Sequence, residues 1–154
     1  MNPLTQLLDR LEHHISNKEL LEQNTSKSSV GWHIEHTLLT INQIIKALTL
    51  CEPAKYRWTF KPFRYIIFAA GKIPRGKAKA PKIVQPKAHF DAHDLRNYHQ
   101  ETKKNVLKLD TMEVNAYFEH PYFGHLQLKQ TVKFLCIHTQ HHLSIVEDII
   151  KNTK

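Results

Sequence analysis

Glycine, cysteine and long apolar runs are scarce in this chain of 154 residues. Four glycines are too few for a barrel or sandwich built from many tight turns. Two cysteines, Cys51 and Cys136, cannot form a disulfide framework and fit a reducing compartment. The longest purely apolar run, residues 66–70, is far shorter than the roughly 20 residues that cross a bilayer. The N-terminus does not resemble a secretory signal. We therefore expect a cytoplasmic protein with no membrane partner.

The composition is that of an ordinary folded protein. Apolar residues make up 41% of the chain and charged residues 23%, which excludes a disordered chain. The length suits one hydrophobic core, so we expect a single domain over residues 1–154. The unusual feature is the presence of twelve histidines.

Acidic residues are absent between Pro53 and Phe90, where ten of the 22 basic residues lie. The rest of the chain has 12 basic and 14 acidic residues, so the net charge of +8 belongs to this segment. This segment has three possible interpretations. It is a solvated connection, a lid that recognises anions through a residue such as Arg75, or a surface that binds nucleic acid. We rank the nucleic-acid surface last and expect no sequence-specific binding of DNA or RNA.

Apolar periodicity predicts four long helices, over residues 2–24, 29–50, 91–109 and 127–151. Lys61 to Ala70 can form a short extra helix, and residues 71–86 are predicted to form an irregular crossover. His120 to Gly124 is predicted to form a turn-rich link. No comparable strand alternation occurs. The sequence therefore predicts an all-α four-helix bundle with a long basic crossover between its second and third helices.

Capping residues support two of these helix starts. Asn2 can cap the first helix, with Pro3 at the first helical position. Asp91 can cap the third helix, and Phe90 can pack against Leu95 as a hydrophobic staple. On the second helix, Glu35 is placed on the polar, solvent-facing side with three other residues (Asn42, Lys46 and Thr49).

The most informative pair is His138 and His142, which occupy two successive positions of the apolar seam of the last helix. Side chains four apart on a helix have Cβ atoms roughly 5–6 Å apart. Two imidazoles at that spacing can bind one metal ion, which would offset the cost of burying them. Two hydrogen-bonded structural histidines are the alternative.

A third ligand has two candidates in the second helix, His33 and His36, and periodicity does not separate them. His141 points about 60° away from the seam. No convincing general base is found, because Glu35 is placed on the polar face and Glu147 is five residues past His142. Cys136 points away from His138, which favours an apolar packing role.

Two segments resemble the DinB-like (YfiT-like) superfamily of metal-binding four-helix bundles. Residues 32–38 resemble its second-helix signature, in which a tryptophan precedes a ligand histidine. Residues 120–124 followed by 138–143 resemble its final helix, where ligand histidines are four apart. Carried over residue by residue, the resemblance implies that His36, His138 and His142 are the metal ligands.

The function follows from the resemblance and from the chemistry of the ligands. Three neutral imidazoles leave coordination positions open and suit one divalent transition metal per chain, zinc or nickel first. The resemblance implies a metal-dependent hydrolase or a transferase of low-molecular-weight thiols, with a small substrate such as a thiol conjugate. The basic crossover, as a lid, favours an anionic substrate. The family and the largely apolar second helix indicate a homodimer. The alternative is a non-catalytic, metal-stabilised bundle whose basic crossover binds an anionic partner.

Overall fold

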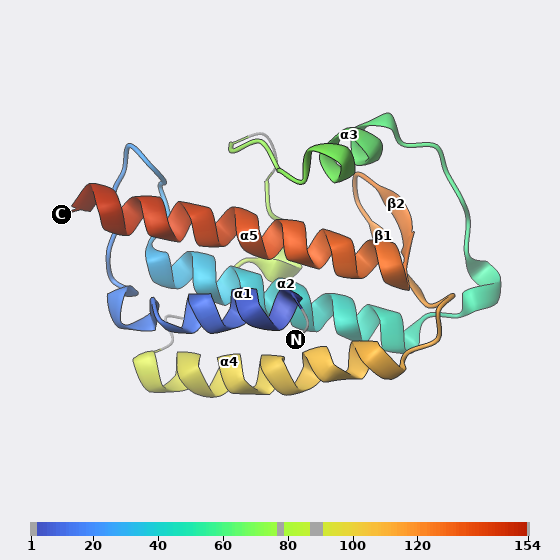
Figure 1. Cartoon of the computed structure of the whole chain (residues 1–154), viewed down its shortest axis with the longest axis horizontal. Helices are drawn as coiled ribbons and strands as arrows, with labels where there is room; N and C mark the ends of the chain where they lie inside the picture. The colour runs from blue at the N-terminus through green and yellow to red at the C-terminus, as the bar shows by residue number, and fades with distance from the viewer. Residues whose placement is uncertain (1–2, 77–78, 87–90, 154) are drawn as a thin grey trace.

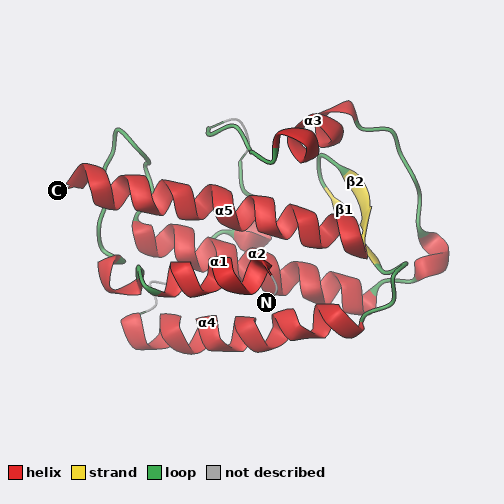
Figure 2. Ribbon diagram, in the orientation of Figure 1, coloured by secondary structure: helices red, strands yellow, loops and turns green. Residues whose placement is uncertain are grey.

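The computed structural model describes residues 3–76, 79–86 and 91–153. Within these ranges the chain is mostly helical, with one small sheet. The helices are α1 (Pro3–Glu12), α2 (Val30–Leu50), α3 (Pro62–Ala70), α4 (Ala92–Val106) and α5 (Leu128–Thr153), and the strands are β1 (Tyr117–His120) and β2 (Gly124–Gln127). In Figures 1 and 2, α1, α2, α4 and α5 lie side by side, whereas α3 and the strands lie at one edge. α1 and α2 each pack against both α4 and α5.

The core forms where the apolar stripes of these helices meet. Leu4, Leu8 and Leu11 of α1 are fully buried, on a helix that packs against α4 and α5. α1 ends at Glu12, well before the predicted end near residue 24. The chain instead turns back toward the start of α2, where Gly31 donates a backbone hydrogen bond to Lys18. A Cβ on Gly31 would lie 2.9 Å from the carbonyl oxygen of Lys18, so this approach needs glycine.

α2 follows the predicted bounds, but its predicted polar face is only partly correct. Lys46 and Thr49 are exposed, whereas Glu35 and Asn42 are not. Glu35 is buried, at 6% exposure, because α4 packs on that side of the helix. Asn42 on the same side contacts α4 through hydrogen bonds with Thr102 and Asn105. Helical periodicity identified a polar side, and that side faces a neighbouring helix along part of its length.

The start of α2 provides a test of local stability. The Ser29 hydroxyl caps the helix by accepting a hydrogen bond from the backbone N–H of Trp32. We expect Ser29→Ala to reduce the free energy of unfolding by about 1 kcal/mol, because the N–H loses its partner. Urea unfolding measures the change, with Ser28→Ala as the matched control. Equal midpoints for the two variants would contradict this role for Ser29.

α4 begins as predicted. The Asp91 carboxylate accepts a hydrogen bond from the backbone N–H of Asp94. Asn2 and Phe90, the other two residues proposed to define helix starts, lie outside the described residues. After Val106 the chain continues as a short 3₁₀ helix, Leu107–Thr111. None of the described helices combines the length and apolar character that a membrane crossing requires.

The hairpin of β1 and β2 was not predicted, so the all-α prediction is incomplete. The strands pair antiparallel, with Tyr117 opposite Gln127 and His120 opposite Gly124. Each strand has four residues, too few to display a clear alternation. The predicted turn does lie between them. Gly124 has a φ of 69°, and a Cβ there would lie 2.5 Å from Thr59 Oγ1.

The short extra helix is confirmed as α3, and a buried arginine attaches it to the hairpin. Arg64 is 1% exposed. Its guanidinium donates hydrogen bonds to the carbonyl oxygens of Thr59, Phe123 and His125 at 3.2–3.4 Å. Beyond α3, the described part of the crossover includes a 3₁₀ turn, Lys82–Val84, which contacts α2.

Candidate metal centre

Three histidines from α2 and α5 meet in the interior. His36, His138 and His142 each offer a ring nitrogen, and these nitrogens all lie within 4.8 Å of one another. The ring centroid of His142 is 4.6 Å from those of both His36 and His138. His36 and His142 are buried, and His138 is partly buried. We call these three residues the histidine cluster.

The helices position the cluster through their packing. His138 and His142 are one turn apart on α5, so their rings lie on the same face of that helix. α2 packs along this face and supplies His36. The His36 ring stacks on Trp32, one turn earlier on α2, with a centroid distance of 5.0 Å. The indole therefore fixes one face of the imidazole.

A backbone carbonyl sets the protonation of His36. Its Nδ1 lies 2.7 Å from the carbonyl oxygen of Val84. Because a carbonyl oxygen only accepts, Nδ1 carries the proton, and Nε2 retains its lone pair. A carbonyl behind one nitrogen and a lone pair on the other is the arrangement found in metal-binding histidines.

His33 lies beside the cluster and contacts it through His142. The Nδ1 atoms of His33 and His142 are 2.9 Å apart, and His33 Nε2 is 2.9 Å from the Ser26 hydroxyl. Of the two candidates in the second helix, His36 is thus the one whose ring nitrogen belongs to the cluster. His33 instead contacts His142 from outside the cluster. Sequence reasoning did not find this contact or the Val84 carbonyl.

Burial keeps the cluster uncharged. Removal from water lowers the pKa of His138 and His142 well below the usual value, and it also lowers the pKa of His36. The pKa of His33 falls to about 3 for the same reason, with a further contribution from His36. Neutral imidazole is the form that binds metal ions. The cluster therefore presents lone pairs at neutral pH.

One buried nitrogen of the cluster lacks a hydrogen-bond partner among the described residues. His138 Nδ1 has no acceptor or donor within reach. A buried polar atom left unpaired costs about 1–3 kcal/mol. An ion bound through this nitrogen would remove that cost. The donor set, the His36 protonation and the unpaired nitrogen are all compatible with a metal ion.

The crossover lies over the neighbouring surface of α5. The His141 ring is hydrogen-bonded to the backbone of Ile73, and its centroid is 5.0 Å from that of His142. Arg75 forms an ion pair with Asp148 at 2.8 Å. Burial lowers the pKa of His141, and the positive charge of Arg75 lowers it further. Arg75 is therefore placed beside the residues that flank the cluster.

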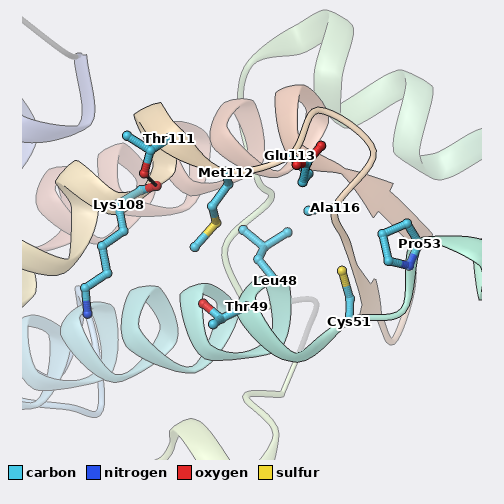
Figure 3. Close-up of a pocket in the computed structure, with 9 residues that line it drawn as sticks. All are labelled: Leu48, Thr49, Cys51, Pro53, Lys108, Thr111, Met112, Glu113 and Ala116. Atoms are coloured by element: carbon cyan, nitrogen blue, oxygen red, sulfur yellow. Dashed lines mark hydrogen bonds between the residues drawn. The ribbon is translucent and has the colours of Figure 1, made fainter.

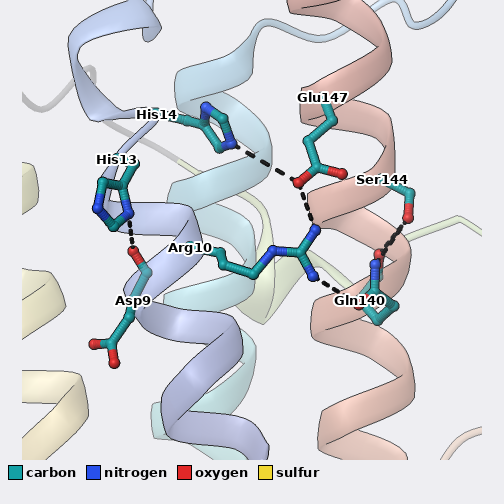
Figure 4. A network of polar contacts seen from close by, with 7 residues as sticks. All are labelled: Asp9, Arg10, His13, His14, Gln140, Ser144 and Glu147. Atoms are coloured by element: carbon teal, nitrogen blue, oxygen red, sulfur yellow. Dashed lines mark hydrogen bonds and ion pairs between the residues drawn. The ribbon is translucent and has the colours of Figure 1, made fainter.

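Among the residues that the structure describes, the other chemically active side chains singled out from the sequence do not join the cluster. Glu147 accepts a hydrogen bond from Arg10 at 2.6 Å and lies 4.0 Å from His14, within the network of Figure 4. Burial raises the pKa of the Cys136 thiol, which disfavours the thiolate. A cavity of about 430 Å³ lies near the end of α2 and is lined in part by Cys51 and Met112 and by none of the cluster histidines. Figure 3 shows its lining residues.

The fold and the cluster together define a class, mostly helical proteins with a three-histidine group that can hold a metal ion. The sequence model of the DinB superfamily matches residues 4–146. The chain therefore belongs to the DinB superfamily, as the resemblance of its second and last helices indicated. Comparison with curated proteins and with solved structures found no match.

Proposed function

We propose that this DinB-superfamily protein binds one divalent transition metal ion through His36, His138 and His142, within a four-helix bundle formed by α1, α2, α4 and α5. The observation that carries the proposal is the meeting of three ring nitrogens within 4.8 Å. Nitrogen ligands favour zinc or nickel over calcium or magnesium. Elemental analysis of protein purified without a metal-affinity tag tests the proposal. Protein that neither contains nor takes up zinc or nickel would contradict it.

The reaction class follows from the ligands. Three imidazoles leave coordination positions for a substrate or water. When bound, a metal ion lowers the pKa of a coordinated water or thiol and so supplies a nucleophile. We therefore propose a metal-dependent hydrolase or thiol transferase. The chain's residues hold the ligands uncharged, through burial, and oriented, through Trp32 and the Val84 carbonyl.

A non-catalytic, metal-stabilised protein is the second candidate. It is favoured by the composition of the cluster, which contains no carboxylate among the described residues that could serve as a general base. The two functions differ in solvent access to the metal. Water relaxation of the nickel-loaded protein distinguishes them, because exchangeable coordinated water is expected of the enzyme and not of a closed structural site.

His33 is proposed to orient His142. If His142 Nδ1 donates to His33 and His33 Nε2 donates to Ser26, His142 Nε2 keeps its lone pair for the metal. We expect His33→Phe to weaken metal binding by about 10- to 100-fold, because His142 loses its acceptor. Competition with a chelating dye measures the affinity.

The control for this prediction is His33→Asn, whose amide oxygen occupies about the position of the histidine Nδ1. It restores an acceptor to His142, so binding should recover at least in part. Equal affinities for wild type, His33→Phe and His33→Asn would show that His33 does not act on His142.

Arg75 is proposed to favour anionic substrates, since it lies beside His141 at the edge of the cluster. Its side chain is 45% exposed, so we expect a modest effect: Arg75→Ala weakens binding of phosphate or acetate to the metal-loaded protein by up to about fivefold. Asp148→Asn releases Arg75 from its ion pair and should strengthen binding. Titration calorimetry measures both, and changes of the same sign would contradict the role of Arg75.

A further inference from the structure

An exposed apolar surface lies on α3 and on the segment that leads into it. We call it the α3 surface, and its members with their exposed fractions are Trp58 (62%), Phe60 (64%), Phe63 (47%), Tyr65 (46%) and Ile66 (62%). The rings of Phe60 and Tyr65 are 5.6 Å apart, so the segment and the helix contribute to one surface. Single exposed apolar residues are ordinary, but a group of this size is typical of an interaction site.

Two buried residues of α3 explain the orientation of this helix. Arg64 and Ile67 are buried, and the Arg64 guanidinium is bonded to carbonyls of the preceding segment and of the hairpin. A Cβ at Gly124 would meet Thr59, which shows how closely this segment lies against the hairpin. α3 therefore cannot rotate to bury its apolar side chains without breaking these bonds, and the surface is preformed.

The charge around the α3 surface favours an anionic partner. No acidic residue occurs between Pro53 and Phe90. Arg57 and Lys61 are exposed on either side of Trp58 and Phe60, and exposed Lys72 follows α3. In a symmetric contact between two copies, these like charges would face one another across the interface. Such a contact is destabilised, whereas a negatively charged partner is attracted.

The residue types indicate which anionic partner fits. Tryptophan, tyrosine and phenylalanine beside lysine and arginine are typical of surfaces that bind at the boundary of a lipid bilayer. Ile66 offers no ring for stacking on a nucleic-acid base, although it can enter the acyl boundary. We propose that the α3 surface binds the surface of an anionic lipid bilayer. The short apolar runs that exclude a spanning segment do not exclude this peripheral contact.

Vesicle binding tests the proposal with a reporter present in the chain. Trp58 is exposed, whereas the other tryptophan, Trp32, is stacked on His36. Vesicles of phosphatidylglycerol and phosphatidylcholine should shift the emission to shorter wavelength and sediment with the protein. Vesicles of phosphatidylcholine alone should bind at least about tenfold more weakly, and added salt should reduce the difference.

Two variants and a matched control locate the contact. The double variant Phe63→Ser with Ile66→Ser should lose at least about tenfold in binding. Lys61→Glu removes one positive charge and adds a negative one, so it should lose at least about fivefold in binding to the anionic vesicles. The control is Val114→Ser. Val114 lies in the loop before β1 with 82% of its surface exposed, and the variant should bind as the wild type does. Circular dichroism confirms that each variant retains its helix content.

Other results would overturn the proposal. No sedimentation with either vesicle, or equal binding to both, removes the anionic bilayer as partner. A dimer by light scattering that becomes monomeric in the double variant shows that a second copy occupies the surface. Binding of single-stranded DNA that the same double variant abolishes, without vesicle binding, assigns the surface to nucleic acid.

Discussion

Replacing either His138 or His142 by alanine is expected to abolish binding of zinc or nickel. Each change removes one of three proposed ligands, and the remaining two imidazoles hold an ion far more weakly. The loss should exceed the about 10- to 100-fold typical of removing an outer hydrogen-bond partner. Elemental analysis after dialysis, together with dye competition, measures it.

The matched control is His141→Ala, which removes an adjacent histidine of the same helix that is not part of the cluster. It should retain metal. All three variants should keep their helix content, because the packed helices bury extensive apolar surface independently of the cluster. Full metal occupancy in His138→Ala or His142→Ala would exclude that residue as a ligand. Loss of helix content together with metal would point to a structural role.

The two histidines on α5 could be identified from the sequence because a single helix determines their relation. Residues four apart share a face whatever surrounds the helix. The choice between His33 and His36 could not be made in this way, because it does not depend on one helix alone. Both residues are buried on α2, and both lie near α5 residues of the site. Which ring reaches the cluster depends on the rotation of α2 against α5, and no residue pattern within one helix specifies that rotation.

Other parts of the structure were missed for similar physical reasons. The Val84 carbonyl that orients His36 belongs to the backbone, so it has no residue-type signal. Glu35 was assigned to solvent because polar residues on a helix usually face water, whereas Glu35 and Asn42 lie on the part of the helix that α4 covers. The hairpin was missed because its strands are short, although its turn was recognised. Patterns within one element were thus more informative than contacts between elements.

Acidification is expected to destabilise the metal-free protein well before most carboxylates titrate. Burial lowers the pKa of His33 to about 3 and that of His120 to about 4, and it also lowers the pKa of His99. The unfolded chain binds protons near the ordinary value of about 6.5. It therefore takes up protons first as pH falls, and stability declines.

The sign of this effect defines the pH window. Stability from these groups is fully present above pH 6.5 and is lost progressively toward pH 3–4, where the folded protein also binds the protons. Urea unfolding between pH 8 and pH 4, with a chelator present, measures the decline. A free energy of unfolding that stays constant from pH 7 to pH 5 would contradict the prediction.

His99 allows the effect to be assigned to one residue outside the cluster. It is fully buried, and its Nε2 donates to the carbonyl oxygen of Leu8 at 2.8 Å. His99→Gln keeps a donor but cannot take up a proton, so the variant should lose less stability on acidification than the wild type does. The control is His93→Gln, which replaces an exposed histidine of the same helix and should leave the pH profile unchanged. Parallel profiles for wild type and His99→Gln would mean that burial of His99 does not contribute to acid sensitivity.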